Sequence, residues 1–441
     1  MTESPTPFSP TASVRESCRR WMDGAQTGND ESQPSKNCAV TINHDGLDHF
    51  AMEISNTILA NKSFHVSEWD ADGWHYTGKN YRSGSNNEFD VLMRMERVAM
   101  YILTMDAINF CFWPTSNANV KNSLEYEHLA VALRKVAELD DVEYDTDSNL
   151  GCNSGCGSII IQSSSSYTLS PRTLSTLTAK QLEDMLMQHL TLLDGNLHFE
   201  IPDICIRCQL LNELGKGILD HHSGSALCMI QKANKSADEL VNIIMQTFPG
   251  FRDFVSDGGI SQSSEWEAAK ELSSTIHFYK RAQIAVADIW AALGRNQSSL
   301  PITTTAFSKF YTCCQFTDMA RITTFPDYRV PQILRHVNVL KYVDDLAQKV
   351  DKEIELEKGC RDEISIRAGT VVAVDNLVLK VKERILTIVS QSDEEEEKKD
   401  LLSLADDVSS VTLDWYLWQQ GEKLDRENLL ESHHRVRTTF Y

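Results

Sequence analysis

Residues 316–342, FTDMARITTFPDYRVPQILRHVNVLKY, limit the fold more than any other stretch of this chain. Their second half has apolar side chains at three- and four-residue steps, a period that predicts a helix with one buried face. These apolar positions are Val330, Ile333, Leu334, Val337 and Leu340. Pro331 favours a helix start here, because the first turn of a helix leaves N–H groups unpaired and proline has none to leave.

Asp327 lies where that helix is expected to begin, beside Tyr328 and Arg329. The unpaired N–H groups and the dipole of a helix N-terminus both favour an anion. One interpretation is that Asp327 only caps the helix. The other is that its carboxylate performs chemistry, which is favoured by Asp318 nine residues earlier, by flanking aromatic residues and by the adjacent arginine.

The composition is that of a globular protein with a strongly acidic balance. The chain has 441 residues, 41% of them apolar, which leaves room for two or three domains. Its net charge of −21 and its pI near 5.0 argue against a surface that binds long nucleic acid through the phosphates. A small anionic ligand in a local basic pocket is compatible with this charge.

Nothing in the sequence indicates a membrane or secretory protein. No apolar run has the length needed to cross a bilayer, and the start, MTESPTPFSP, lacks the basic and apolar regions of a secretion signal. The eleven cysteines, an odd number, are then best interpreted as reduced thiols of an intracellular protein. We therefore expect a cytoplasmic protein with no membrane partner.

The expected organisation is a tail followed by one helical body. Residues 1–36 are rich in Ser, Thr and Pro and have no period, which predicts disorder. Residues 37–441 form the body, with low-complexity inserts near 141–170 and 390–400. Amphipathic periods predict helices at residues 40–59, 124–139, 178–193, 204–220, 236–248 and 265–293, with Thr178 or Ser236 as capping candidates. Residues 370–374 fit either a strand or a buried helical turn.

Polar residues in apolar or aromatic surroundings are candidates for a binding site. The segment YILTMDAINFCFWP contains Asp106 and Asn109, and burying either without a partner costs about 1–3 kcal/mol. These two residues either pair inside the core or contact a ligand. His75 lies in the aromatic-rich residues 63–87, and it either forms the rim of a pocket or is a surface histidine without a role.

Four cysteines at two short spacings raise the question of a zinc site. Cys152 and Cys156 fall in the Gly/Ser-rich insert, whereas Cys205 and Cys208 fall in the predicted helix, in ICIRC. Because one pair lies in a low-complexity insert, we expect no metal and leave the role of these thiols open.

Two further motifs place charged residues next to helix breaks. FPGFRD interrupts the helical pattern with proline and glycine and presents Phe251 and Asp253 on a turn. FYKRAQIAVADIW carries Lys280 and Arg281, which are either solvated or part of a local basic pocket. Residues 401–441 contain LDWYLW and HHRVRTTFY, which are too apolar for a loose end and are expected to pack on the body.

Several motifs follow one another in a characteristic order: DAINFCFW, LLNELGK, FPGFRD, FYKRAQIAVADIW, FTDMARITTFPDYRVPQIL, LDWYLW and the basic aromatic C-terminus. Together they resemble the queuosine salvage protein family. The likeness covers most of residues 40–441 outside the inserts. Members of the family are queuosine 5′-phosphate N-glycosylases (hydrolases), which release the base queuine. The resemblance implies a mainly α-helical fold with few short strands, similar to helix-hairpin-helix DNA glycosylases, in which a catalytic Asp opens a helix.

The resemblance also implies hydrolysis of a ribose–base bond without a cofactor or metal. Such a reaction passes through an oxocarbenium-like state, which a fixed carboxylate stabilises while it accepts a proton from the attacking water. Asp253 and Asp327 are the candidate catalytic residues. Repulsion and burial can keep one of two close carboxyls protonated, and the sequence does not divide the roles.

The parts of the substrate define the expected binding residues. A guanine-like edge is read by Asp and Asn side chains, its flat faces need aromatic walls, and the 5′-phosphate needs cations. We expect Asp106, Asn109 and Asp318 to contact the edge of the base, and Trp113, Phe251, Phe325 and Tyr328 to stack on its faces. Lys280, Arg281 and Arg329 are expected to bind the phosphate. His75 is a further candidate for substrate binding, from a loop that aligns loosely with a His-containing loop of the family.

Two other functions compete with hydrolysis. A carrier would bind a 7-deazaguanine nucleotide or base and leave the glycosidic bond intact, so product formation separates it from an enzyme. A helix-hairpin-helix protein acting directly on DNA or tRNA is disfavoured by the low pI and by the lack of a Lys/Arg stripe. The sequence leaves open the activity on the free nucleoside and the oligomeric state.

Overall fold

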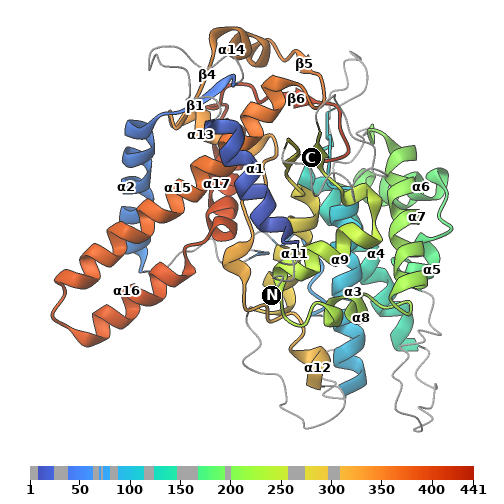
Figure 1. Cartoon of the computed structure of the whole chain (residues 1–441). Coiled ribbons are helices and arrows are strands. Elements are labelled where there is room, and N and C mark those ends of the chain that lie inside the picture. The colour runs from blue at the N-terminus through green and yellow to red at the C-terminus, as the bar shows by residue number, and fades with distance from the viewer. Residues whose placement is uncertain are drawn as a thin grey trace, which may run out of the picture. The chain divides into compact units, whose positions relative to one another are not determined.

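The computed structural model of this chain describes residues 8–23, 38–62, 69–70, 73–79, 88–113, 124–146, 167–193, 200–256, 274–295 and 308–441. As predicted, these residues are mainly helical, with strands of two or three residues (Figure 1). They group into two compact units, where the sequence indicated one body. The first unit takes its described residues from Met1–Trp69, Arg252–Gln283 and Asp318–Tyr441, and the second from Asp70–Phe251 and Ile284–Thr317.

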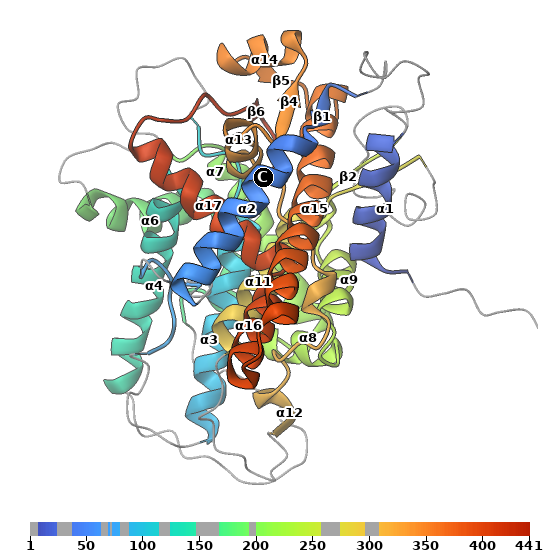
Figure 2. The ribbon, with the colours of Figure 1, turned by 90° about the vertical axis from the view of Figure 1, so that its left-hand side faces the viewer.

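The first unit is organised around one long helix, α15 (Arg361–Gln391). Among the helices that pack against it are α1 (Pro10–Asp23), α2 (His44–Asn61), α16 (Glu395–Asp407) and α17 (Ser410–Arg426). Figures 1 and 2 show α2 running along α15 and α16 folding back beside it. Helix α13 (Arg329–His336) also contacts α15, and the described residues of this unit include α14 (Asp344–Asp351) and the 3₁₀ helix η4 (Met319–Arg321).

The contact between α2 and α15 shows why these segments are helical. Leu47, Phe50, Ile54 and Ile58 on α2, and Val374, Leu377, Val381 and Ile385 on α15, recur every three or four residues and are all buried. Burial of each such side chain stabilises the fold by about 1.5–3 kcal/mol. Residues 370–374 are therefore a buried helical turn, which decides between the two interpretations of that segment.

Three short two-stranded sheets complete the first unit. Strand β1 (Val40–Ile42) pairs antiparallel with β4 (Leu340–Tyr342), and β2 (Phe254–Val255) pairs antiparallel with β3 (Ile276–His277). Strand β5 (Glu355–Leu356) pairs in parallel with β6 (Arg435–Val436). The last pairing holds the C-terminal residues on this unit, as the apolar composition of that end predicted.

Two predictions of irregular structure need correction. The prediction of disorder for residues 1–36 is wrong for Pro10–Asp23, which form α1, whereas residues 1–7 and 24–36 lie outside the described residues. In α1, Val14, Cys18 and Met22 recur every four residues and form a buried face that the Ser/Thr/Pro composition obscured. The segment near 390–400 is not a loop insert, because α15 extends to Gln391 and α16 begins at Glu395. The acidic first turn of α16 is favourable at the positive end of the helix dipole.

The helix predicted from residues 316–342 is shorter than its apolar period. It ends at His336, and Asn338 then adopts a left-handed conformation with φ of 59°, which asparagine tolerates better than most residues. Leu340 therefore lies in β4 opposite Ile42 and not on the helix. The helix predicted at residues 40–59 is corrected for the same reason, because its first residues form β1 and α2 begins at His44.

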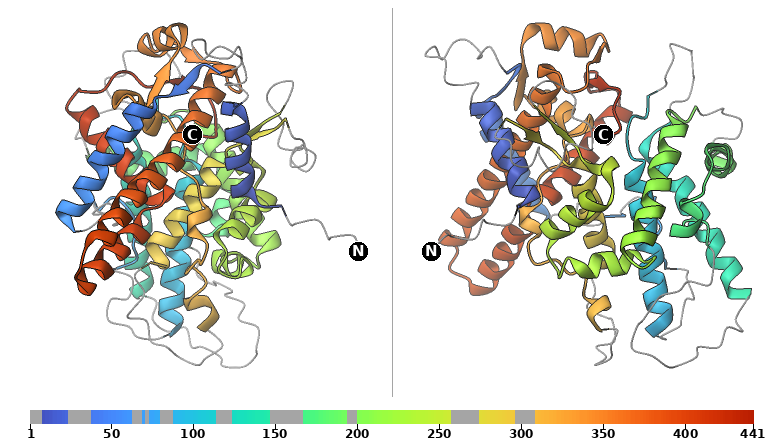
Figure 3. Two further views of the ribbon diagram at one scale, coloured as in Figure 1. Left: turned by 60° about the vertical axis from the view of Figure 1, so that its left-hand side comes forward. Right: turned by 45° about the vertical axis from the view of Figure 1, so that its right-hand side comes forward.

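The second unit is a set of packed helices. Helix α3 (Glu88–Ala107) contacts α4 (Tyr126–Thr146), α7 (Ile204–His221) and α8 (Ala226–Lys232). Their colours, from light blue for α3 to yellow-green for α8, identify them in Figure 3. The others are α5 (Pro171–Leu174), α6 (Ala179–Leu193), α9 (Ala237–Thr247), α12 (Ser308–Tyr311) and the 3₁₀ helix η2 (Pro249–Phe251). The boundary between the units falls within α11 (Lys280–Leu293).

Two sequence predictions for this unit have direct outcomes. Ser236 caps α9, since its Oγ accepts a hydrogen bond from the N–H of Glu239 at 3.1 Å. In the predicted insert at 141–170, α4 continues to Thr146, and residues 147–166 lie outside the described residues. Across the part of the chain that the structure describes, no helix is both long and apolar enough to span a bilayer.

Candidate active site

Asp327 caps α13, as one interpretation of the sequence predicted. Its Oδ1 accepts hydrogen bonds from the N–H groups of Arg329 at 2.9 Å and Val330 at 3.0 Å. Burial raises the pKa of this carboxyl group, whereas the Lys280 ammonium and the two N–H groups lower it. Both hydrogen bonds reach the same carboxylate oxygen.

Asp414 lies close to Asp327 and was not found from the sequence. It comes from LDWYLW on α17, and its Oδ1 accepts hydrogen bonds from the hydroxyl of Thr324 and from the N–H of Phe325, the latter at 2.7 Å. Burial, together with the negative charge of Asp327, raises the pKa of Asp414 to about 8. We call Asp327 and Asp414 the acid pair. The acid inside the otherwise apolar and aromatic run LDWYLW is the signal that could have found Asp414.

Lys280 supplies the positive charge near the acid pair. It opens α11 and is only 3% exposed, and its ammonium favours the ionised form of both acids. The neighbouring Arg281 is 1% exposed. The interpretation of these two residues as a solvated charge pair is therefore excluded.

Asp253 forms a buried ion pair that sequence reasoning did not predict. Its two carboxylate oxygens accept hydrogen bonds from the two terminal nitrogens of Arg367 on α15, one at 3.0 Å. The guanidinium also donates to the carbonyl of Pro326 at 3.2 Å and stacks 3.9 Å from the ring centroid of Phe278. Arg367 is 1% exposed, and its charge is balanced by this carboxylate and, at 3.7 Å, by that of Glu363.

The guanidinium of Arg329 binds side chains of α17. It donates to Glu422 at 2.7 Å, to Gln332 at 2.7 Å and to Asp425 at 3.0 Å. The adjacent Tyr328 is buried, with its ring 4.7 Å from that of His433 in the C-terminal segment. Burial lowers the pKa of this histidine to about 4, so it is neutral at pH 7.

Asp318 and Phe325 complete the predicted residues in the first unit. Phe325 is buried and contributes its N–H to Asp414. Asp318 precedes η4 and is partly buried, and its carbonyl accepts a hydrogen bond from the N–H of Arg321 at 2.9 Å. The first unit thus contains eight of the predicted site residues, which are Asp253, Lys280, Arg281, Asp318, Phe325, Asp327, Tyr328 and Arg329.

The other five predicted residues belong to the second unit. They are His75, Asp106, Asn109, Trp113 and Phe251, and all five are buried. Asp106 lies in the last turn of α3, with Asn109 and Trp113 in the segment that follows. Phe251 lies in η2, with its ring 5.9 Å from that of Phe248.

His75 is held between two hydrogen-bonding side chains. Its Nδ1 lies 3.1 Å from a carboxylate oxygen of Asp70, and its Nε2 lies 2.9 Å from the hydroxyl of Tyr126. With Arg134 and Asp141 it lines a cavity of about 250 Å³. These contacts exclude the interpretation of His75 as a surface histidine, and they add Tyr126 to the polar groups that the sequence did not reveal.

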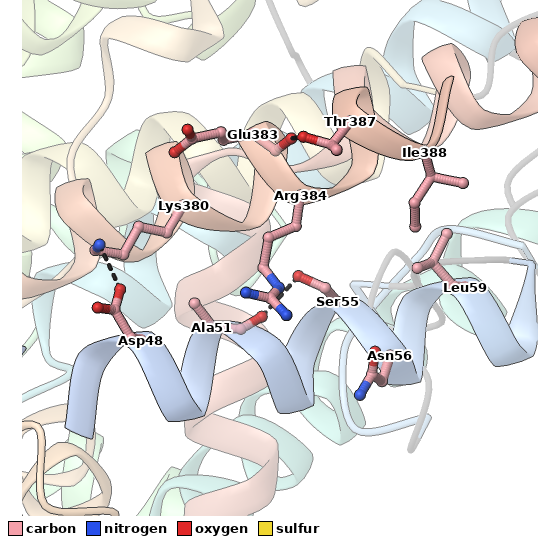
Figure 4. A pocket seen from close by; sticks show the side chains of 10 residues that line it. All are labelled: Asp48, Ala51, Ser55, Asn56, Leu59, Lys380, Glu383, Arg384, Thr387 and Ile388. Carbon is pink, nitrogen blue, oxygen red and sulfur yellow. Dashed lines mark hydrogen bonds and ion pairs between the residues drawn. The ribbon is translucent and has the colours of Figure 1, made fainter. Parts of the chain in front are cut away.

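A groove of the first unit lies away from the acid pair. It has a volume of about 460 Å³ between α2 and α15, with Ser55, Lys380 and Arg384 among its lining residues (Figure 4). Lys380 pairs there with Asp48. Because an α-helix rises 1.5 Å per residue, Lys380 lies about 20 Å along α15 from Arg367. We assign no chemistry to this groove.

Only two of the four cysteines considered as zinc ligands lie within the described residues. Cys152 and Cys156 lie outside them, whereas Cys205 is exposed and Cys208 is buried with its thiol 3.1 Å from the carbonyl of Leu177. Within the described ranges, His, Cys, Asp and Glu side chains form no group of three that could hold a metal ion.

Comparisons with known proteins point to one family. The chain is 27% identical over 407 residues to the queuosine 5′-phosphate N-glycosylase/hydrolase of Dictyostelium discoideum, covering 91% of this chain and 94% of that protein. Proteins of the same name are 26% identical in Sphaerobacter thermophilus, covering 78% and 82%, and 31% identical in Mus musculus, covering 53% and 57%. The family model described as queuosine salvage protein matches residues 90–441. The chain therefore belongs to the queuosine salvage protein family.

Proposed function

We propose that this protein hydrolyses the N-glycosidic bond of queuosine 5′-phosphate and releases queuine for salvage into tRNA modification. Family membership and the names of relatives that span most of the chain support this function. The structural observation that carries it is the acid pair, in which Asp327 is fixed at a helix N-terminus beside Asp414 and the Lys280 charge.

In this reaction water adds to the sugar carbon while the bond from that carbon to the base nitrogen breaks. Positive charge develops on the ribose, and a fixed, ionised carboxylate stabilises it more in the transition state than in the ground state. We assign this role to Asp327: burial raises its pKa, while the Lys280 ammonium, two N–H groups and the helix dipole act in the opposite direction and favour its ionised form. The same carboxylate accepts one proton of the attacking water, whose oxygen bonds to the sugar carbon, and the departing base nitrogen takes up one proton, so that the water is divided between ribose 5-phosphate and queuine.

Asp414 has a positioning role in this mechanism. With a pKa of about 8 it holds a proton at neutral pH, so that the pair carries one negative charge and not two. The single charge remains on Asp327. This assignment divides the roles of two carboxyl groups by environment, as in other enzymes with paired acids.

Asp253, the last residue of the FPGFRD motif, supports the site indirectly. Arg367 engages both of its oxygens and also binds the carbonyl of Pro326, the residue before Asp327. We therefore assign Asp253 to holding the segment that carries Asp327. Direct contact between Asp253 and the sugar would require this buried ion pair to open.

For the 5′-phosphate we propose Lys280 and Arg281, two adjacent buried cations at the start of α11. Arg329 binds groups on α13 and α17. Contacts of the base with His75, Asp106, Asn109, Trp113, Phe251, Asp318, Phe325 and Tyr328 remain predictions. A cytoplasmic location and the absence of a long nucleic-acid partner also remain predictions.

Replacing Asp414 by Asn is expected to change the pH dependence of stability. The folded-state pKa of about 8 exceeds the ordinary value of 3.8, so the folded protein retains a proton that the unfolded chain releases. The contribution of this group to stability is fully present below pH 4, declines as the pH rises to about 8, and is constant above that. Asn still accepts the hydrogen bonds of Thr324 and Phe325 but cannot ionise, so the variant should have the higher melting temperature at pH 8.

Thermal unfolding of both proteins at pH 5 and pH 8 measures this difference. The gap between their melting temperatures should widen from pH 5 to pH 8. The wild-type rate of queuine release should also decline above pH 8, a decline that the variant lacks. Equal pH dependence of stability in the two proteins would show that Asp414 is not protonated in the folded state.

Hydrolysis is expected to continue at an unchanged rate in EDTA, because the proposed mechanism uses only carboxyl groups and a lysine. Purified protein is incubated with queuosine 5′-phosphate, with and without EDTA, and free queuine is measured by chromatography. Loss of release in EDTA that zinc restores would contradict the metal-independent mechanism. Binding of the nucleotide without release in either tube would favour the carrier.

A further inference from the structure

Arg15 of helix α1 reaches a segment that is distant in sequence. Its terminal nitrogens donate to the carbonyls of three successive residues, Ala320 at 3.3 Å, Arg321, and Ile322 at 2.9 Å. Its Nε donates to Asp375 on α15 at 3.1 Å. The fork of one guanidinium thus joins α15 to the backbone of residues 320–322.

That backbone leads directly to the groups that hold the acid pair. The N–H of Thr323 donates to Gln283 at 2.9 Å, and the side-chain amide of Gln283 donates back to the hydroxyl of Thr323 at 2.8 Å. The next two residues, Thr324 and Phe325, bind the Oδ1 of Asp414. A shift of residues 320–322 would therefore move both hydrogen-bond donors of this carboxyl group.

Helix α1 is itself fixed at several points, so Arg15 extends from a rigid element. Arg20 donates to the carbonyl of Thr275 at 2.9 Å, and the Oγ of Ser17 accepts the N–H of His277 at 3.0 Å. Trp21 donates to Ser365 on α15 at 3.3 Å. These bonds, together with the buried face of α1, hold the helix against β3 and α15.

We propose that Arg15 is a positioning residue for hydrolysis, which places Thr324 and Phe325 so that they orient Asp414 beside Asp327. The inference rests on the proposed function and adds a residue outside 90–441, the part of the chain that the family model matches. Arg15 acts through backbone carbonyls and contacts neither acid through any hydrogen bond that the structure gives.

Arg19 provides a matched control on the same helix. It also pairs with Asp375, at 3.1 Å, but its hydrogen bonds do not include the carbonyls of residues 320–322. Its side chain is 51% exposed and that of Arg15 is 20% exposed, so neither substitution leaves a large buried cavity. Arg15→Ala and Arg19→Ala both weaken the contact between α1 and α15, but only the first frees the segment.

The experiment measures three quantities in the full-length wild type, Arg15→Ala and Arg19→Ala: kcat and KM for queuine release, melting temperature, and hydrogen exchange at the amides of Thr323 and Phe325. In Arg15→Ala, kcat should fall by about tenfold to a hundredfold, with KM changed less than threefold. Exchange at both amides should accelerate. Arg19→Ala should match the wild type in kcat and in exchange. Arg15→Lys, which keeps the charge but not the fork, should give an intermediate kcat.

Two results would overturn the inference. One is a kcat in Arg15→Ala equal to that in Arg19→Ala with faster amide exchange, which would reduce Arg15 to a structural contact. The other is unchanged exchange at both amides, which would show that Arg15 does not hold the segment. If wild type and variants all fail to release queuine, the proposed function is wrong, and the exchange data alone still decide whether Arg15 orders residues 323–325.

Discussion

Asp327→Asn is expected to lower kcat for queuine release by about a thousandfold while the protein remains folded. The reason is a difference between the two roles of this side chain. Asn retains an oxygen that accepts the N–H groups of Arg329 and Val330, so the cap of α13 persists. It lacks the negative charge that stabilises the oxocarbenium-like state and cannot accept a proton from water.

Steady-state kinetics and thermal unfolding of the purified variant test this prediction. The matched control is Asp344→Asn, which removes an exposed carboxylate from the first turn of α14 in the same unit. The control should keep the wild-type rate. A wild-type rate in Asp327→Asn would reduce Asp327 to a helix cap, and the chemistry would have to be assigned to another group.

Asp253→Asn is expected to destabilise the protein by about 3–5 kcal/mol. The substitution removes the carboxylate that binds both terminal nitrogens of Arg367, which is 1% exposed, and leaves the longer contact of 3.7 Å with the carboxylate of Glu363. A buried charge that loses its main partner is far less favourable than one at the surface. A loss of this size is a large part of the stability of an ordinary domain, so the variant should unfold at much lower urea concentration.

Asp48→Asn is the matched control for this experiment, because Asp48 also pairs with a basic residue of α15. Its partner, Lys380, is 35% exposed and Asp48 itself is 59% exposed, so the loss should be below about 1 kcal/mol. If Asp253→Asn were as stable as the wild type but did not turn over, Asp253 would be a catalytic residue, as the sequence alone suggested. If the variant loses both stability and activity, Asp253 has the positioning role.

Local patterns predicted much of the fold. The period of three and four residues identified α2, α4, α6, α7 and α9, and it gave α13 with its start. It also placed Asp327 at the N-terminus of α13, where the structure has it. These features depend on neighbours within one or two turns of helix, and such neighbours are visible in a sequence.

The parts that were missed depend on partners that are far apart in sequence. Arg367 and Asp253 are separated by 114 residues, and Asp414 and Phe325 by 89, so no local pattern relates them. Helix α1 was missed because its short buried face lies among Ser, Thr and Pro residues. The roles of the carboxyl groups follow from such distant contacts, and the sequence alone could not divide them.

The most direct test of the central claim is to count turnovers. Purified protein is mixed with a large molar excess of queuosine 5′-phosphate, and queuine and ribose 5-phosphate are quantified over time by chromatography. Hydrolysis predicts that both products appear in equal amounts and exceed the protein concentration many times over. Nucleotide that is bound stoichiometrically and recovered intact would contradict the account and identify the chain as a carrier.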